Sequence, residues 1–462
     1  MTVLFEPATG ERLAEVELAG ESEIDGAVAS AREALDRDWR KTSANERSRL
    51  LHALADALAA SRSELAELEA RNVGKAISSV EAELAQAVET FRFYAGAVGS
   101  IGGRTGSIGG SLLFYSLEEP VGVCAQIVPW NYPLMLAAWK VAPALAAGCT
   151  VVLKPDPLTP LSALRLGELA TEVGIPAGVV NVVAADARVG AYLVRHPGVD
   201  KVAFTGSTAT GGEIMRLCAD PIKRVSLELG GKSPSIVFAD ADLADAVASS
   251  AWAIFYSAGQ SCEARSRLLV EATVYDDVVS RLTELAQRVR VGDPLDVETQ
   301  MGSLISTAHR ERVHGFVEQA GGEVTTGGAV PAGAGAFYPP TVIAGADGGS
   351  RAVQEEIFGP VVTVAPFADE DEAVRLANGV RYGLMATVWT GDPARGHRLA
   401  RRIASGTVGI NTPYSAFPGV PFGGYKQSGF GRELGLETLE LYLETKSVLT
   451  RTGPRPSNPF RL

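Results

Sequence analysis

Apolar residues recur every three or four positions in two segments near the start of the chain, residues 24–37 and 45–70. This spacing puts them on one face of a helix and predicts two amphipathic helices. Residues 79–98 have the same pattern and predict a third helix. The pattern stops at a Gly/Ser-rich run, residues 99–111, which cannot be helical and leads into the strand-like stretch SLLFYSLEEP. An insertion therefore separates this helical region from the remainder of the chain.

From Val121 onward, short apolar runs alternate with helical patterns. The runs, which we interpret as strands, are VGVCAQIV, CTVVLKP, GVVNVVAA and KVAFTG. Strands separated by helices of this length predict parallel pairing, and nearly continuous apolar strands indicate a sheet covered on both faces. Ligands in such sheets bind at the carboxyl ends of the strands.

A second α/β pattern starts after Leu229 with PSIVFA and continues to about Gly429, with helices predicted over residues 275–290 and 307–319. The final stretch, RELGLETLELYLETKSVLTR, predicts a short helix and then a strand, followed by a polar tail. A chain of 462 residues has room for two to four domains, since a domain takes roughly 100–200 residues. The fold class is therefore predicted to be α/β with more than one domain.

The composition of the chain argues against several classes of function. The net charge of −12 makes nucleic-acid binding improbable, because an acidic chain repels phosphate backbones. The four cysteines have no CxxC spacing and the five histidines no HExxH motif, so neither a metal site nor a disulfide framework is predicted. The first residues do not resemble a signal peptide, and no apolar run approaches ~18 residues, which predicts a soluble, cytoplasmic protein without a membrane segment.

Cys262 is the candidate nucleophile. It follows a Gly–Gln–Ser turn between a predicted helix and the predicted strand RSRLLVE. A thiol with a pKa near ~8.5 is already a good nucleophile, and a tight turn can hold it exposed at a domain boundary. The other three cysteines, Cys124, Cys149 and Cys218, lie inside apolar patterns and are interpreted as small core residues.

Two polar residues are candidates for assisting this nucleophile. Glu228 ends an apolar strand beside a Gly–Gly pair, and a carboxylate against an apolar wall has the raised pKa that suits a general base; a solvated strand-end carboxylate is an equally good interpretation. Asn131 lies in the Trp–Asn–Tyr turn of VPWNYP, where a rigid amide can donate to an oxyanion, although a turn residue capping the next helix is the more common case.

Three further motifs suit a nucleotide. In KVAFTGSTATGG, a strand leads through Gly206 and Ser207 to the start of a helix, where backbone amides bind phosphate. Lys154 ends another strand, within reach of a ribose or phosphate if the fold places it at the cleft. In QEEIFGP, Glu356 could bind ribose hydroxyls and Phe358 could flank a nicotinamide ring. Each motif alone is better explained as an ordinary surface or core feature.

Taken together and in order, these motifs resemble the aldehyde dehydrogenase superfamily of the NAD(P)-dependent, non-acylating type. The matching order is PWN, KP, FTGST, LELGGK, GQ-x-C, EEIFGP and PFGGYKQSG-x-G-RE-G, and the likeness runs from FEPATGERL near the start to ETKSV at residues 444–448.

The resemblance implies a role for each matched position. Cys262 would attack the aldehyde to form a thiohemiacetal, and the Asn131 amide with the Cys262 backbone amide would hold the oxyanion. Glu228 would activate the water that hydrolyses the resulting thioester to a carboxylate, and Lys140 would serve a proton path. NAD or NADP would be bound by Lys154, Ser207, Gly206, Gly211, Glu356, Phe358, Trp130 and Leu229. The substrate tunnel would be lined by Tyr132, Met135, Trp139, Tyr256, Phe417 and Phe422.

The family fold implies three parts: a Rossmann-like cofactor domain (residues 1–98 and 121–230), an α/β catalytic domain (231–428) and a small β oligomerisation element (99–120 and 429–462). This division accounts for the interruption at Gly99. It also implies a homodimer or homotetramer, because the small element would otherwise expose an unpaired sheet edge.

One departure from the family pattern concerns the cofactor. Many NAD-preferring relatives have Glu two residues after the Lys–Pro of this strand end, where this chain has Pro157. Because Pro157 leaves this position without a carboxylate that would repel the 2′-phosphate of NADP, the enzyme is expected to accept NADP. The tunnel residues favour medium aliphatic or aromatic aldehydes over succinate semialdehyde. Three alternatives remain open: a coenzyme A-acylating enzyme, a semialdehyde- or glyceraldehyde-3-phosphate-specific enzyme, and a protein that kept the fold without catalysis.

Overall fold

Apolar runs in the first half of the chain form a six-stranded sheet. Its order is β19-β9-β8-β5-β6-β7, and every neighbouring pair is parallel except β19 with β9. The strands are β5 (Val123–Ile127), β6 (Thr150–Lys154), β7 (Val180–Val182), β8 (Lys201–Thr205), β9 (Arg224–Glu228) and β19 (Gly429–Phe430). The parallel pairing predicted from strand–helix alternation is confirmed, and β5, β6 and β8 are buried along their whole length.

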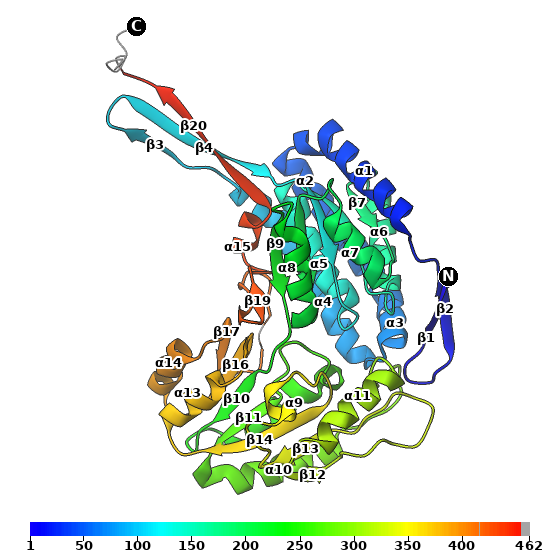
Figure 1. Cartoon of the computed structure of the whole chain (residues 1–462), viewed down its shortest axis with the longest axis vertical. Coiled ribbons are helices and arrows are strands. Elements are labelled where there is room, and N and C mark those ends of the chain that lie inside the picture. Colours follow the sequence, from blue (N-terminus) through cyan, green and yellow to red (C-terminus); the bar gives the residue numbers. More distant parts are fainter. Residues whose placement is uncertain (415, 454–462) are drawn as a thin grey trace.

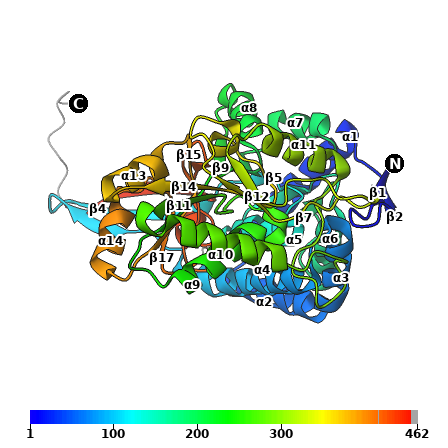
Figure 2. The same cartoon turned by 90° about the horizontal axis from the view of Figure 1, so that it is seen from below.

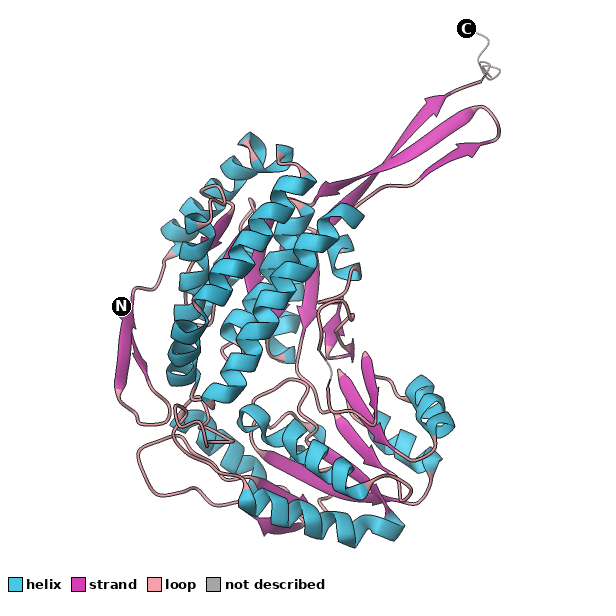
Figure 3. Cartoon of the chain, turned by 180° about the vertical axis from the view of Figure 1, so that it is seen from behind, coloured by secondary structure: helices cyan, strands magenta, loops and turns pink. Residues whose placement is uncertain are grey.

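Helices cover both faces of this sheet. The helices α1 (Glu21–Arg37), α7 (Ala187–Arg195) and α8 (Thr208–Ala219) lie in front in Figure 1. On the other face lie α5 (Pro133–Ala147) and α6 (Leu161–Glu172), with an outer layer of α2 (Ala44–Ala60), α3 (Arg62–Val73) and α4 (Ile77–Ala97), which is in front in Figure 3. A short hairpin of β1 (Thr2–Phe5) and β2 (Arg12–Val16) precedes α1.

The single helix predicted over residues 45–70 is wrong, because the structure has two helices there. Ser61 has φ −89° and ψ 7°, ends α2 and begins α3. Serine favours helix ends because its hydroxyl competes for backbone hydrogen bonds. The change of direction lets α2 pack against α5 while α3 packs against α6.

The second α/β body has a seven-stranded sheet in the order β12-β13-β14-β11-β10-β16-β17, parallel except for β12. Its strands are β10 (Pro234–Val237), β11 (Arg267–Glu271), β12 (Glu323–Thr326), β13 (Thr341–Ala344), β14 (Val361–Phe367), β16 (Met385–Trp389) and β17 (Thr407–Ile410). Its helices are α9 (Leu243–Phe255), α10 (Tyr275–Arg288), α11 (Thr307–Glu318), α12 (Arg351–Gln354), α13 (Glu370–Asn378) and α14 (Pro393–Arg402). The small pair β15 (Tyr382–Gly383) and β18 (Tyr425–Lys426) lies where the chain returns to the first body. Figure 2 shows this body from below, with α9 and α10 in front.

A third, three-stranded antiparallel sheet projects away from the first body (Figure 1). It consists of β3 (Thr105–Ile108), β4 (Leu112–Pro120) and β20 (Leu443–Arg451), so the Gly-rich insertion pairs with the C-terminal strand. Two short elements of residues 429–462 lie elsewhere: β19 pairs with β9, and α15 (Glu437–Glu440) packs on α5.

The computed structural model describes residues 1–414 and 416–453; most of the polar tail expected after the last strand falls outside the described residues. Among the described helices, none combines the length and apolar character needed to span a bilayer. The first sheet directs the carboxyl ends of β5, β8 and β9 toward the second body (Figure 1), and β9 ends at Glu228, where the chain crosses between the two bodies.

Candidate active site

Cys262 follows a turn of unusual backbone geometry between α9 and β11. Ser257 and Ala258 have φ values of 54° and 53°, in the left-handed region. Such non-glycine residues cost about 1–3 kcal/mol each, so surrounding contacts must hold the turn. The fully buried Gln260 side chain provides one contact, because its amide donates to the Ser257 carbonyl at 3.2 Å.

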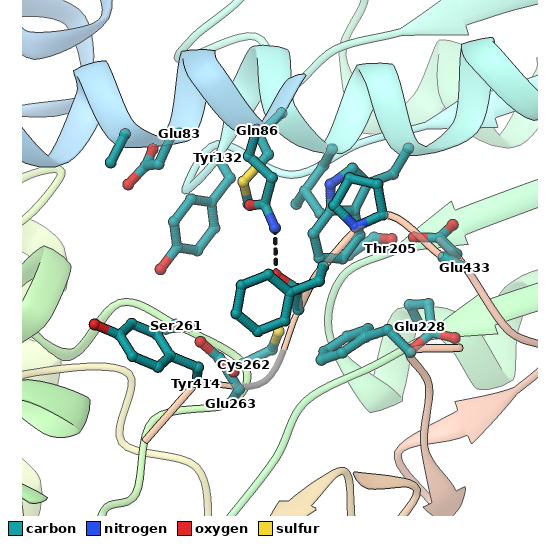
Figure 4. A pocket seen from close by; sticks show the side chains of 18 of the residues that line it. Glu83, Gln86, Tyr132, Thr205, Glu228, Ser261, Cys262, Glu263, Tyr414 and Glu433 are labelled. Atoms are coloured by element: carbon teal, nitrogen blue, oxygen red, sulfur yellow. Dashed lines mark hydrogen bonds between the residues drawn. The ribbon is translucent and has the colours of Figure 1, made fainter. Parts of the chain in front are cut away.

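The turn places Cys262 where two cavities meet. One cavity, of about 400 Å³, is lined largely by aromatic side chains, and the other, of about 310 Å³, extends toward the first sheet. Figure 4 shows Cys262 between Tyr132 on one side and Glu228 on the other. A nucleophile at this junction can attack a carbonyl group that is bound in one cavity. The resulting adduct then faces a group that is bound in the other cavity.

The Cys262 thiol is in a setting that disfavours its charged form. Burial raises its pKa well above the ordinary thiol value, and the nearby carboxylates of Glu263, Glu356 and Glu228 raise it further. At neutral pH the resting side chain is therefore a thiol, and its attack requires loss of the proton.

Asn131 lies in the loop between β5 and α5, against the segment that carries the nucleophile. Its side-chain nitrogen donates to the Gln260 carbonyl at 2.8 Å, and its buried side-chain oxygen has no hydrogen-bond partner. The structure thus brings the predicted oxyanion donor to the turn before Cys262, although 131 positions separate the two residues in the chain.

Glu228 ends β9 and lines the aromatic cavity with its carboxylate almost wholly buried. Within the described residues, neither carboxylate oxygen has a hydrogen-bond partner. Burial raises the pKa of Glu228 well above its ordinary value and the charge of Glu433 adds to this, while Lys140 and Arg432 act in the opposite direction. A buried carboxyl of this kind accepts a proton readily, which suits a general base.

Lys140 on α5 is buried and forms an ion pair with Glu433. Glu433 lines the same cavity as Glu228, and Figure 4 shows the two carboxylates grouped on one side of it. Glu433 was not singled out from the sequence, because its motif, RELG, does not reveal that it meets a lysine on a distant helix.

All six predicted tunnel residues line the aromatic cavity: Tyr132, Met135, Trp139, Tyr256, Phe417 and Phe422. Among the further lining residues that the sequence did not indicate are Glu83, Gln86, Trp252 and Tyr414. Trp252 lies within 5.6 Å of Tyr414 between ring centroids, at the open end of the cavity. Helical periodicity placed these positions on helices but could not tell which face borders a cavity.

Glu263 and Arg265, which flank the nucleophile, form an ion pair of 3.3 Å. The Arg265 guanidinium is buried and also donates to the Pro413 carbonyl. The arginine therefore braces the loop at the tunnel wall, and its charge is paired rather than directed at Cys262.

The second cavity continues into a third, of about 760 Å³, along the edge of the first sheet. Trp130 lines both of these cavities, and so do Gly206 and Ser207, which lie at the N-terminus of α8. Ser207 caps this helix by accepting from Thr210 N at 3.2 Å. The two cavities form one channel of two lobes, which meet at a helix N-terminus. A dinucleotide fits such a channel with its pyrophosphate where the lobes meet.

The lobe beside Cys262 holds several of the predicted cofactor residues. Leu229, Glu356 and Phe358 line it, and Glu356 accepts from Gly231 N at 3.0 Å. Burial raises the pKa of Glu356 to about 7. Gly211 does not line either lobe; a Cβ there would lie 2.6 Å from Leu229, so its role is close packing of α8.

His309 is a residue of this lobe that the sequence did not indicate. Its ring nitrogen is 2.7 Å from the Phe358 carbonyl, and Phe358 has a φ of 62°. Trp130 packs edge-on against Phe358 at 5.2 Å between ring centroids. Burial lowers the pKa of His309 to about 4, so its ring is neutral and supports Phe358 without adding charge.

The far lobe is lined by Lys154, Asp156, Pro157 and Arg188. Lys154 donates to the Pro155 carbonyl at 3.0 Å, and burial lowers its pKa. Asp156 accepts from Leu158 N at 3.0 Å. Arg188 was not singled out from the sequence; it reaches this lobe from α7 and pairs with Glu21.

Comparison with known proteins places this geometry in a family. Residues 2–448 match the aldehyde dehydrogenase family. The chain is 45% identical over 455 residues to a betaine aldehyde dehydrogenase of Vibrio vulnificus (strain CMCP6), covering 97% of this chain and 93% of that protein. It is 44% identical to the putative aldehyde dehydrogenase DhaS of Bacillus subtilis (strain 168), covering 96% of this chain and 90% of that protein.

Solved structures agree. A crystal structure of a putative aldehyde dehydrogenase from Burkholderia cenocepacia superposes with a TM-score of 0.97 at 43% identity, covering 99% of this chain and 95% of that chain. A betaine aldehyde dehydrogenase from Staphylococcus aureus, solved in complex with NAD+, has a TM-score of 0.97 at 39% identity, covering 99% of this chain and 93% of that chain. The predicted α/β fold is confirmed, and the chain belongs to the aldehyde dehydrogenase family.

Proposed function

We propose that this enzyme oxidises an apolar aldehyde to its carboxylate with NAD+ or NADP+, through a covalent intermediate on Cys262. The observation that carries the proposal is the convergence of Cys262, Asn131 and Glu228 at the junction of an aromatic tunnel and a channel in two lobes. The Cys262 thiol releases its proton to water in the open tunnel, its sulfur adds to the carbonyl carbon, and the Asn131 amide with the Cys262 backbone N–H stabilises the oxyanion of the thiohemiacetal.

NAD+ or NADP+ held in the two-lobed channel would supply the hydride acceptor, and loss of a hydride from that carbon would leave a thioester on Cys262. Glu356 in the near lobe and Lys154 in the far lobe would bind the two ribose units, with Ser207 at the pyrophosphate between them. Trp130 and Phe358 would form the wall beside the nicotinamide.

Glu228 completes the turnover by taking a proton from water, whose oxygen adds to the thioester and displaces the Cys262 thiolate. Its carboxyl lies beside Glu433 and Lys140, which offer a buried route for that proton. This retained base favours hydrolysis over transfer of the acyl group to coenzyme A, the nearest alternative.

The far lobe supports acceptance of NADP+. Pro157 puts no carboxylate beside the ribose site, and the Arg188 guanidinium lines the same lobe. Two acids, Asp156 and Glu213, line this lobe, and burial raises the pKa of Asp156, which favours its neutral form. A 2′-phosphate would thus meet the Arg188 cation, which also pairs with Glu21, without a carboxylate at position 157 to repel it.

The tunnel supports a medium aliphatic or aromatic substrate. Among the described residues that line it, none is lysine or arginine, because Arg265 turns away to pair with Glu263. An aldehyde with a terminal carboxylate, such as succinate semialdehyde, would find no cation there.

A second candidate is betaine aldehyde, which names several relatives. The open end of the tunnel gathers Trp252, Tyr256, Tyr414 and Phe417, with the carboxylate of Glu263 nearby. Aromatic faces attract quaternary ammonium groups. A kcat/KM for betaine aldehyde well above that for uncharged aldehydes of similar length would favour this candidate.

Steady-state formation of reduced cofactor tests the function. Wild type should turn over an aldehyde panel with either NAD+ or NADP+, and Cys262→Ala should show no turnover. Comparing hexanal, benzaldehyde, betaine aldehyde and succinate semialdehyde assigns the substrate class. Coenzyme A-dependent turnover, or full activity of Cys262→Ala, would contradict the proposed reaction.

We also infer that the enzyme assembles as a homodimer or homotetramer through the projecting sheet. On β4, alternate residues Leu113, Tyr115 and Leu117 are exposed on one face; Leu449 on β20, which pairs with Phe114 and so lies on the other face, is 63% exposed. An apolar sheet face of this kind is typically covered by another chain. Sedimentation of wild type against Leu113→Glu/Leu117→Glu tests this, since a monomeric wild type would exclude it.

A further inference from the structure

A buried ion pair adjoins the tunnel, and neither partner takes part in the chemistry proposed above; one of the two, Glu83, lines the tunnel. The Lys75 ammonium, in the loop between α3 and α4, is 2.7 and 2.8 Å from the two carboxylate oxygens of Glu83 on α4. The side chains are 1% and 4% exposed. Two charges withdrawn this far from water cost several kcal/mol each to desolvate, so an ion pair in this position is seldom retained for stability alone.

Each partner touches one side of the active site. The Lys75 ammonium lies 3.5 Å from the centroid of the Tyr132 ring, and Tyr132 directly follows Asn131. The hydroxyl of Tyr256 donates to Glu83 at 3.0 Å, and Tyr256 begins the strained turn that leads to Cys262. The ion pair therefore connects the oxyanion side, in the first body, with the nucleophile turn, in the second body.

A second carboxylate extends the same arrangement. Glu69 on α3 is buried, accepts from Leu134 N at 2.9 Å and also accepts from the Ser162 hydroxyl. Leu134 N is in the first turn of α5, so Glu69 caps the helix that starts just after Asn131. Burial raises the pKa of Glu69 to about 7. The loop carrying Asn131 and Tyr132 is thus held from α3 and α4 together.

We propose that Glu83 and Lys75 are positioning residues that set the separation of the Asn131 amide from Cys262, and so control the rate of hydride transfer. The proposal rests on the proposed roles of Asn131 and Cys262. Catalytic geometry is sensitive to such support, because a displacement of about 1 Å can cost ~100-fold in rate. Figure 4 shows Glu83 and Tyr132 together on the α4 side of the cavity, facing Cys262 across it.

Two variants separate positioning from folding. Tyr256→Phe removes one hydroxyl and keeps the ring in the tunnel wall. The double variant Lys75→Met/Glu83→Leu replaces the ion pair with apolar groups of similar size, a change that is often neutral or stabilising, whereas removing one charge alone leaves the other buried and unpaired. The matched controls are Glu81→Gln and Tyr192→Phe. Glu81 lies on the exposed face of α4, and the Tyr192 hydroxyl donates to the exposed Asp25.

Pre-steady-state formation of NADH is the readout, because its amplitude reports the fraction of folded active sites and its rate constant reports geometry. We expect the rate constant to fall about 10–100-fold in the double variant and less in Tyr256→Phe, with the KM for NAD+ within about twofold of wild type. Both controls should keep the wild-type rate constant.

A wild-type rate constant in the double variant, whatever its amplitude, would overturn the proposal. If that variant fails to fold, Tyr256→Phe alone tests the proposal, and a wild-type rate constant in Tyr256→Phe would overturn it. Cys262→Ala is measured in parallel: NADH formation by that variant would refute the proposed nucleophile, a result distinct from failure of the ion pair as a positioning device.

Discussion

Lys140 on α5 and Glu433 near the end of the chain form a buried ion pair although 293 positions separate them. The pair lies beside Glu228, whose pKa is raised first by burial and second by the charge of Glu433. The proposed base is therefore tuned by a residue that the sequence motifs do not connect to it.

Glu433→Gln should shift the pH profile of turnover to lower pH. Removing the Glu433 charge eliminates one cause of the raised pKa, so Glu228 ionises at lower pH, and activity that requires its carboxylate is retained further into the acid range. Leaving Lys140 buried and unpaired should also cost roughly 3–5 kcal/mol of stability. The measurement is kcat against pH together with thermal unfolding, with exposed Glu440→Gln as control. An unchanged acid limb would argue against the coupling.

Glu228→Gln should block hydrolysis without blocking hydride transfer. Turnover is expected to fall about 10²–10⁴-fold, the usual contribution of a general base, while one equivalent of NADH still forms rapidly. Rapid mixing detects that burst, and mass spectrometry detects the acyl group on Cys262. Loss of the burst together with turnover would mean that Glu228 acts before the thioester.

Asn131→Ala should lower the rate of thiohemiacetal formation about 10²–10³-fold, because it removes one of the two oxyanion donors. Asn131 also donates to the Gln260 carbonyl, so thermal unfolding must show that the turn survives. Iodoacetamide labelling of Cys262 needs no oxyanion donor and should proceed at the wild-type rate. Near wild-type aldehyde oxidation would remove Asn131 from the proposed mechanism.

Pro157→Glu should shift preference from NADP+ to NAD+. A carboxylate facing the ribose would repel a 2′-phosphate, and we expect kcat/KM for NADP+ to fall at least about tenfold, equivalent to ~1.4 kcal/mol. Arg188→Ala tests the attractive side and should also weaken NADP+ more than NAD+. If wild type already turns over NADP+ orders of magnitude more slowly than NAD+, acceptance of NADP+ is wrong.

Gly259→Ala should destabilise the nucleophile turn. Gly259 has φ of 70°, and a Cβ there would collide with the Gly359 carbonyl oxygen. The combined strain should cost more than about 2 kcal/mol, seen as a lower midpoint in urea unfolding. Gly26→Ala, at an open position on α1, is the control and should not destabilise.

The local pattern of apolar and polar residues was sufficient to predict the parallel sheet and to show the motifs in their order. Nearly continuous apolar runs such as Val123–Ile127, in which Gln126 is the one polar residue, can be buried on both faces only inside a covered sheet, and that consequence depends on hydrophobicity. Cys262, Asn131, Glu228, Lys154 and Glu356 all lie in turns or at strand ends, where function concentrates, so their motifs stood out. Their roles remain predictions until the variants are measured.

Tertiary structure alone decided which distant residues meet. Glu83 is one of several acids on an amphipathic helix, and its periodicity does not reveal that it pairs with Lys75 and receives the Tyr256 hydroxyl. Arg265 pairs with its neighbour Glu263, but packing between segments far apart in the chain directs it to Pro413 and directs His309 to Phe358. The sequence by itself determined the fold class and the chemical groups available. Side-chain burial and pairing in the folded chain determined their charge states and spacing, because those depend on tertiary contacts that no local pattern encodes.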